Sequence, residues 1–285
     1  MSNRVAVIGT GLMGYAVARA LCTSGYEVHA WNRTRAKAEP LVQSGATVHA
    51  SVAEAVGAAD IVIPVVEDCA QAAALLTTGG VDLAARDVLN LVTGSPREIE
   101  ALVATLERAG AAVASGTIMC FPGQIGSDDA TIMFGGSPQF WARHEPLVKS
   151  LAGGSMMLGE TPSLPNKFDT AMVGCLFVTS YAAFAEAVKY LKAEGVDPRG
   201  FAPFIPATLT SLQAMMEDAV KAVEAGDFAT DQASIATFER THAMFRRSMA
   251  GAGVDDFMLE AGQKWLRKAI EGGDGASSLT ALVRH

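Results

Sequence analysis

The sequence predicts an α/β protein with an N-terminal doubly wound parallel sheet, a long inter-domain helix and an all-helical C-terminal domain. Two observations lead to this prediction. Short apolar runs alternate with amphipathic stretches as far as about residue 159, which is the pattern of βαβ units. From residue 165 onward the periodicity is helical throughout. We therefore expect a first domain at residues 1–162, a connecting helix at 163–194 and a helical domain at 195–285.

The first unit has a strand at residues 4–8, a glycine-rich turn, Gly9-Thr10-Gly11-Leu12-Met13-Gly14, and then an amphipathic helix. In such a unit the first glycine makes the tight bend, the second lets the backbone approach a pyrophosphate, and the third lets helix and strand pack closely. The pyrophosphate then lies at the positive end of the helix dipole. The motif predicts a Rossmann dinucleotide-binding domain, and the alternative is a purely structural turn. The residues expected at the cofactor are Gly9, Gly11, Leu12, Met13 and Gly14.

The end of the second strand, residues 26–31, indicates which dinucleotide binds. An NAD site usually has an Asp or Glu there to accept from the ribose 2′-hydroxyl. This chain has Asn32, Arg33 and Thr34, with Lys37 behind them. Two cations and a hydroxyl suit a 2′-phosphate, so the sequence predicts NADPH. The alternative is that the basic residues only form the solvated first turn of the next helix.

The later elements continue the alternation and then change character. Strands are expected at residues 60–64, 87–91, 111–114 and 131–134, with a helix at 96–108 that has Pro and Glu in its first turn. A helix at 165–194 would span about 45 Å and is apolar around much of its circumference, so it needs a second partner. Another subunit is the simplest source, which predicts a homodimer. Further helices are expected at 204–225, 234–250 and 256–270, and the Gly/Ser-rich tail from Gly272 is expected to be mobile.

Composition limits the class of protein. The net charge of −8 over 285 residues argues against nucleic acid and against an anionic membrane surface. The uncharged stretch 170–185 is shorter than a membrane span and is interpreted as a buried core helix. Four scattered cysteines, with no CxxC motif and no spacing typical of metal ligands, favour a reducing compartment and no metal. We expect a cytoplasmic enzyme.

Three segments carry a resemblance to a known superfamily. They are Trp31-Asn32-Arg33-Thr34 with Lys37, Asn90-Leu91-Val92-Thr93-Gly94-Ser95-Pro96, and the run from Ser115 to Gly126 that ends in Phe-Pro-Gly-Gln-Ile-Gly. The chain resembles the β-hydroxyacid dehydrogenases and their relatives, the imine reductases. The Asp-x-Pro-Val-Ser-Gly-Gly segment of the hydroxyacid branch is absent, and the segments found are similar to those of imine reductases.

The start of the long helix contains two candidate catalytic residues, Lys167 and Asp169. The resemblance implies a catalytic Lys in hydroxyacid dehydrogenases, followed by paired Asn residues that are missing here, and a proton-donating Asp in imine reductases. A carboxylate can stabilise an iminium cation and hold its proton, whereas a lysine would repel the cation. We expect Asp169 to be catalytic and Lys167 to lie at the surface or behind the site. The alternative for Asp169 is that it only complements the helix dipole.

Two weaker candidates complete the predicted site. Thr93 follows a strand at the carboxyl edge of the sheet, where nucleotide ligands lie, so we expect it, together with Ser95, near the nicotinamide. His242 lies on an apolar helix at a place where imine reductases often have a His near the substrate, although a lone His is more often structural.

The resemblance implies NADPH-dependent reduction of a cyclic imine, and also reductive amination of a ketone with an amine. It further implies a domain-swapped homodimer. Two rival interpretations stay open at this point. One is a 3-hydroxyacid dehydrogenase that uses Lys167, and the other is a non-catalytic NADP-binding protein.

Overall fold

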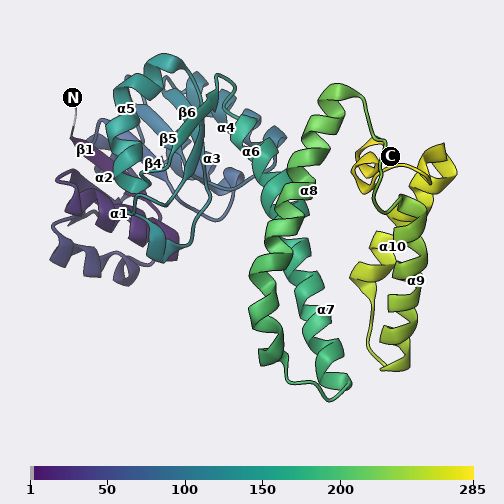
Figure 1. Ribbon diagram of the computed structural model, residues 1–285. Helices are drawn as coiled ribbons and strands as arrows, with labels where there is room; N and C mark the ends of the chain where they lie inside the picture. The colour runs from purple at the N-terminus through teal and green to yellow at the C-terminus, as the bar shows by residue number, and fades with distance from the viewer. Residues whose placement is uncertain (1–2) are drawn as a thin grey trace. The chain divides into compact units, whose positions relative to one another are not determined.

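A computed structural model describes residues 3–285 of the chain (Figure 1). The chain divides into two compact units, and the division falls between Val173 and Gly174. It lies inside the helix that the sequence analysis set apart as a connecting segment. We call the part up to Val173 the nucleotide unit and the part from Gly174 to His285 the helical unit.

The nucleotide unit is built on an eight-stranded sheet in the order β3-β2-β1-β4-β5-β6-β7-β8. Neighbouring strands are parallel, except for the antiparallel pair β6–β7. The order of the first six is that of the Rossmann fold, which confirms the predicted fold class. The strands are β1 (Arg4–Ile8), β2 (Glu27–Trp31), β3 (Thr47–Val48), β4 (Ile61–Pro64), β5 (Asp87–Asn90), β6 (Ala112–Ile118), β7 (Ile132–Gly135) and β8 (Met156–Gly159).

Helices cover both faces of this sheet. One apolar core joins the sheet to α1 (Leu12–Thr23) and α5 (Pro138–Leu151). A second core joins its other face to α2 (Val52–Gly57), α3 (Cys69–Thr77) and α4 (Pro96–Arg108). The short 3₁₀ helices of this unit are η1 (Arg35–Lys37), η2 (Glu39–Ser44) and η3 (Pro122–Gln124).

Burial on both faces explains why the strands read as continuous apolar runs rather than as alternating ones. Each residue from Val5 to Ile8 is fully buried. The chain order reverses at β1, which has β2 on one side and β4 on the other. A crevice at the carboxyl ends of the strands is expected at such a switch point, and the glycine turn lies directly after β1.

Strand β6 is longer than the sequence indicated. The expected strand ended at Ala114, but β6 continues to Ile118. The reason is a second neighbour, because Ser115 to Ile118 pair with residues 132–135 of β7, and only Ser115 also pairs with the end of β5, at Asn90. Gly116 permits this pairing, since a Cβ there would lie 2.8 Å from Leu91 and 2.9 Å from Ile132.

The long helix runs from Leu164 to Ala193. It consists of α6 (Leu164–Asp169), a π-helical stretch η4 (Thr170–Val178) and α7 (Thr179–Ala193). The interpretation of residues 170–185 as a buried core helix is wrong for the single chain, because no residue of η4 or α7 is buried. By length and composition alone the helix could cross a membrane, with a mean hydropathy of 1.6. Large exposed apolar surfaces of this kind mark interaction sites.

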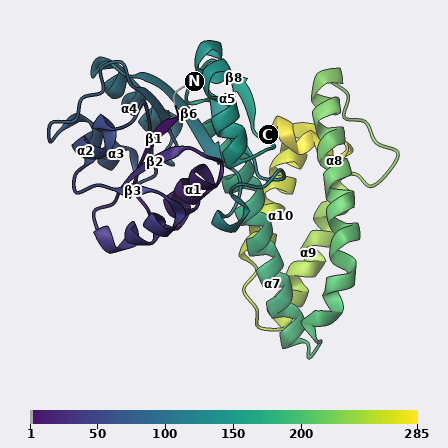
Figure 2. The same ribbon diagram turned by 90° about the vertical axis from the view of Figure 1, so that its left-hand side faces the viewer.

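The helical unit continues with η5 (Pro198–Phe204), which the sequence analysis did not predict. The helices α8 (Ile205–Ala225), α9 (Ile235–Gly251) and α10 (Phe257–Ala269) follow, close to the predicted bounds. Helices α9 and α10 lie side by side in both views (Figures 1 and 2). The fully buried cluster of this unit is small and consists of Ile235, Leu266, Ala269 and Ala281. Many large apolar side chains of α7 and α8 are exposed instead, including Tyr181, Leu209 and Val220.

The expectation of a mobile tail is wrong. Residues 270–284 form the turns η6 (Ile270–Asp274) and η7 (Leu279–Arg284), and Ala281 is fully buried. The ring of His285 lies 2.7 Å from the carboxylate of Asp274, which holds the pKa of that carboxyl below its usual value. The composition of the tail suggested flexibility, but its few apolar residues complete the small core of this unit.

Candidate active site

The glycine turn has the close contacts that the motif requires. Gly9 has φ +101°, and a Cβ on it would lie 2.3 Å from the Val65 carbonyl oxygen. A Cβ on Gly14 would lie 2.0 Å from the Gly9 carbonyl oxygen. A larger residue at Gly9 would therefore clash with the segment that follows β4, and a larger residue at Gly14 would push α1 away from the glycine turn.

Gly11 differs from its neighbours because it is exposed and a Cβ on it would meet nothing within 4 Å. It is the N-cap of α1, it makes no side-chain cap, and the first turn contains no acidic residue. The free N–H groups of this turn form a ready site for an anion such as a pyrophosphate. Leu12 is exposed beside them, while the Met13 side chain packs on the core, so Met13 could offer only its backbone to a ligand.

Asn32 shapes the turn rather than presenting a free amide to a ribose. Its Oδ1 accepts a hydrogen bond from the Thr10 N–H at 2.9 Å, and its Nδ2 donates to the Thr34 carbonyl at 2.9 Å. The side chain thus ties the glycine turn to the segment that follows β2. The sequence placed Asn32 correctly at the end of the strand, but it gave no sign of this bridge.

The basic residues after β2 are exposed, and they differ in their partners. Arg35 forms an ion pair with Glu39. Neither Arg33 nor Lys37 forms an ion pair with any residue from 3 to 285, and both side chains are exposed beside Thr34. Two unpaired cations and a hydroxyl at the carboxyl end of β2 fit a 2′-phosphate, and the empty space at Gly11 fits the pyrophosphate of the same dinucleotide.

The loop after β5 is held at its start by Asn90 and is exposed at Thr93. Asn90 accepts from the Val92 N–H and donates to Ser115, which holds the end of the strand. Ser95 caps α4 through a reciprocal pair of hydrogen bonds with Glu98. Its hydroxyl therefore has a structural task, and Thr93 is the better candidate for contact with a nicotinamide.

Asp169 and Lys167 have different environments, as their spacing of two residues predicts. Lys167 is exposed. Asp169 is half-buried, and within residues 3–285 its carboxylate makes no hydrogen bond or ion pair. Burial raises the pKa of the Asp169 carboxyl above its usual value. A carboxyl with a raised pKa and a free polar end is suited to hold and release a proton.

Asn166 links this helix to the loop that carries Thr93, and sequence reasoning missed it. It lies in the first turn of α6 and is 2% exposed. Its Nδ2 donates to the Gly94 carbonyl oxygen at 3.1 Å. An Asn in the first turn of a helix looks like an ordinary polar residue in a sequence, so no signal in the chain pointed to a buried link. Asn166 thus ties the helix that carries Asp169 to the Thr93 loop.

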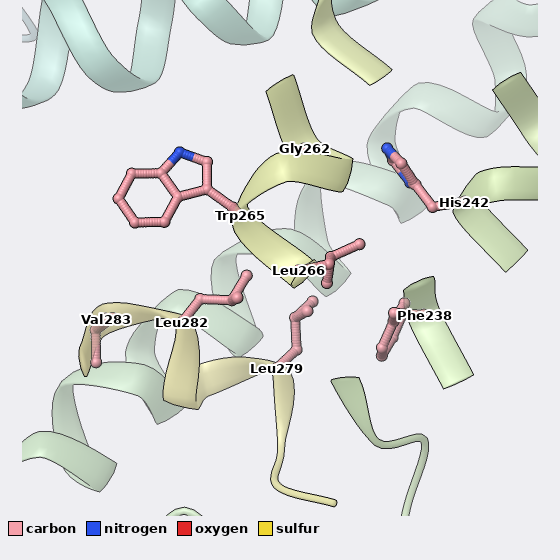
Figure 3. Close-up of a pocket in the computed structure, with 8 residues that line it drawn as sticks. All are labelled: Phe238, His242, Gly262, Trp265, Leu266, Leu279, Leu282 and Val283. Atoms are coloured by element: carbon pink, nitrogen blue, oxygen red, sulfur yellow. The ribbon is translucent and has the colours of Figure 1, made fainter. Parts of the chain in front are cut away.

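His242 has a structural partner in the helical unit. Its Nε2 lies 2.9 Å from the Leu259 carbonyl oxygen and donates to it, and a Cβ on Gly262 would lie 3.0 Å from the same nitrogen. The ring borders an apolar groove of about 480 Å³ (Figure 3), lined also by Phe238, Trp265, Leu266, Leu279, Leu282 and Val283. Through these contacts the His242 ring links α9 to α10 and has a structural role.

No metal centre is formed by the described part of the chain, where no three His, Cys, Asp or Glu residues are arranged to hold an ion. The four cysteines are free. The chemistry available at the carboxyl edge of the sheet is therefore that of an anion-binding turn, a basic patch and an isolated carboxyl.

Comparison with known proteins agrees with this geometry. Residues 4–159 match the family model described as the NAD binding domain of 6-phosphogluconate dehydrogenase. That match covers more than half of the chain. The chain belongs to this family. Residues 161–285 match a second model, the C-terminal domain of NADPH-dependent reductive aminase-like proteins, so the resemblance to imine reductases is confirmed over both parts of the family fold.

Individual relatives support the same placement within the family. The NADPH-dependent reductive aminase of Aspergillus oryzae is 27% identical over 100% of this chain and 97% of its own length. An imine reductase structure from Pseudomonas sp. superposes with a TM-score of 0.93 at 26% identity, covering 98% of each chain. An imine reductase from Myxococcus stipitatus in complex with NADP⁺ also gives 0.93 at 26% identity and 98% coverage of both chains.

Proposed function

We propose that this protein is an NADPH-dependent reductase of carbon–nitrogen double bonds, which reduces cyclic imines and carries out reductive amination of ketones. The observation that carries the proposal is Asp169, a half-buried carboxyl without a polar partner among residues 3–285, on the helix that Asn166 joins to the Thr93 loop. The relatives named above provide the substrate class, and the unpaired Arg33 and Lys37 favour NADPH over NADH.

The residues of the chain have distinct tasks in this reaction. The N–H groups at the start of α1 hold the pyrophosphate, while Arg33, Thr34 and Lys37 hold the 2′-phosphate. When bound, NADPH supplies the hydride that reaches the imine carbon. Asp169 faces the nitrogen, stabilises the positive charge of the iminium and holds its proton. The raised pKa of Asp169 suits a group that must be protonated for part of the cycle.

The hydroxyacid dehydrogenase interpretation is less favoured. It requires a lysine in the site to stabilise a developing alkoxide, but Lys167 is exposed, two residues from Asp169 and so on another face of the helix. The interpretation as a non-catalytic NADP-binding protein requires only the glycine turn, and it assigns no role to the isolated carboxyl of Asp169.

A substrate panel and two variants test the proposal. We expect NADPH to be consumed with cyclic imines and with ketone–amine pairs, and NADP⁺ not to be reduced with 3-hydroxyacids. Asp169→Ala should lower kcat by about 10²–10⁴, the range of a general acid–base group. Lys167→Ala is the matched control on the same helix, and it should be mild. The reverse ranking of the two variants would contradict the assignment.

We also propose that the protein works as a homodimer formed through the helical unit. Its fully buried cluster has four residues, while side chains such as Phe177, Tyr181 and Val220 are 57%, 66% and 62% exposed. So small a core is unusual for a unit of this length, and a second copy would cover the exposed faces of η4, α7 and α8.

Light scattering at micromolar concentration tests the dimer, together with the variant Val220→Glu. We expect twice the chain mass for the wild type and a shift toward monomer for the variant. Lys221→Glu, which changes the charge of a neighbouring exposed residue, is the control. An active monomer of wild-type protein would contradict the proposal.

We place the enzyme in the cytoplasm as part of the same proposal. Four free cysteines suit a reducing compartment, and a dimer would cover the apolar helix that could otherwise enter a membrane. Fractionation of cells by ultracentrifugation tests this, and recovery of the protein in the membrane pellet would contradict it.

A further inference from the structure

The buried side-chain amide of Asn166 has a hydrogen-bond partner for only one of its two polar groups. An apolar residue at this position would not bury an unpaired polar atom. Nδ2 donates to the Gly94 carbonyl oxygen, but Oδ1 is buried and has no hydrogen-bond partner among the described residues. Buried polar atoms without partners are few in native proteins, because leaving one unpaired costs its full desolvation penalty. What a polar side chain at position 166 provides, and an apolar one cannot, is therefore the hydrogen bond to the Gly94 carbonyl oxygen.

That link joins two parts of the candidate site. Gly94 follows Thr93 directly in the loop after β5, and a Cβ on Gly94 would lie 2.6 Å from the Cys69 sulfur, so the loop packs closely against Cys69 at this point. Asp169 comes three residues after Asn166, which places the two on one face of the helix, one turn apart. The carboxylate of Asp169 has no polar contact of its own within residues 3–285. Its position is set by the helix backbone, and the helix is tied to the loop by Asn166.

A second tether holds the same helix start to a different element. The hydroxyl of Ser163 donates to Glu100 of α4 at 2.7 Å, and Ser163 is fully buried. It fixes the beginning of α6 in place, but it does not reach the Thr93 loop. The two tethers are comparable in burial and differ in what they join.

We propose that Asn166 is a positioning residue, whose amide fixes the turn that carries Asp169 against the Thr93–Gly94 loop. This rests on the proposed function, because the property it sets is the distance from the Asp169 carboxyl to the nitrogen being reduced. A displacement of about 1 Å in such a site costs on the order of 10²-fold in rate.

The test compares Asn166→Ala with the matched control Ser163→Ala and adds a double-mutant cycle with Asp169→Ala. We expect Asn166→Ala to lower kcat for a cyclic imine about 10–100-fold, with the Kd for NADPH unchanged. Ser163→Ala should keep kcat within about threefold, since its tether does not reach the loop. In the Asp169→Ala background, Asn166→Ala should cost nothing further, because no carboxyl is left to position.

A second variant separates positioning from folding. Asn166→Leu has a similar volume, removes the unpaired oxygen and cannot donate, so it should fold and should lose kcat as Asn166→Ala does. The inference is overturned if Asn166→Leu keeps the wild-type kcat, or if the effects of Asn166→Ala and Asp169→Ala multiply. A full kcat for Asp169→Ala alone would instead contradict the proposed function.

Discussion

Two glycines in the same turn should respond differently to the same substitution. Gly11→Ala adds a methyl group where the described chain leaves open space, at φ −64° and ψ −171°, which alanine adopts freely. Alanine is a poorer N-cap than glycine, but it restricts the unfolded chain by about 0.4–1 kcal/mol. The two effects nearly cancel, so the melting temperature should stay within about 2 °C of the wild type.

Gly14→Ala is different, because its Cβ would lie 2.0 Å from the Gly9 carbonyl oxygen. Either α1 or the turn must move by about 1.4 Å to reach ordinary contact, and such overpacking costs about 1–3 kcal/mol. Helix propensity returns about 0.5–1 kcal/mol. The net loss of roughly 0.5–2 kcal/mol should lower the melting temperature by about 1–8 °C in a chain of this size, at about 2–4 °C per kcal/mol.

The affinity for NADPH is a second property affected by a substitution in this turn. The methyl of Gly11→Ala lies where the pyrophosphate meets the start of α1, and one lost charge-assisted hydrogen bond costs about 1.5–3 kcal/mol, or roughly 10–150-fold in Kd. Thermal unfolding without ligand and NADPH titration by calorimetry measure both quantities. Unchanged NADPH affinity in a folded Gly11→Ala protein would refute the assignment of this turn to the cofactor. An unchanged melting temperature for Gly14→Ala would refute the packing argument.

Three further predictions concern single side chains. Arg33→Ala should weaken NADPH binding about 10–150-fold and leave NADH binding nearly unchanged. Arg35→Ala is the control and should change neither affinity, because the Arg35 guanidinium is already paired with Glu39. Equal losses of NADPH affinity in titrations of the two variants would count against the 2′-phosphate site. Burial raises the pKa of the Asp169 carboxyl in the folded state, so its ionised form costs stability above that pKa. Asp169→Asn should therefore melt higher than the wild type at neutral pH, and this gain should shrink below the folded-state pKa and vanish below the unfolded-state pKa. His285→Ala should lower the melting temperature and make it depend less on pH in the acid range, because the low pKa of the Asp274 carboxyl contributes stability that is lost as the pH falls. An unchanged melting temperature of His285→Ala at every pH would disprove the packing of the C-terminal tail.

The parts of the fold that sequence could predict are those that depend on local pattern. The strand, glycine turn and helix at residues 4–23, and the helices near 205, 235 and 257, follow from periodicity and from residues with special backbone geometry. The family resemblance rested on the same kind of local segment. The position of Asp169 on the long helix could also be predicted, because its neighbours resemble a known pattern.

The parts that sequence missed depend on contacts between distant residues. The bridges from Asn32 to Thr10 and from Asn166 to Gly94 join residues 22 and 72 apart, and neither leaves a periodic trace. The tail appeared mobile because its composition hides the burial of Ala281. The apolar stretch after Asp169 was interpreted as core because hydrophobicity alone does not tell which surface covers a helix.

The π-helical stretch that begins directly after Asp169 bears on how this protein tolerates changes in length. A π turn closes onto the fifth residue rather than the fourth, so each turn holds one residue more than an α turn. Losing one residue there converts a wide turn into a regular one without rotating the helix on either side. A gain or loss elsewhere in the helix would rotate every later side chain by about a quarter of a turn. Homologues that differ by one residue in this helix are therefore expected to differ between Thr170 and Val178, where evolution can adjust the length of the helix while Asp169 keeps its place.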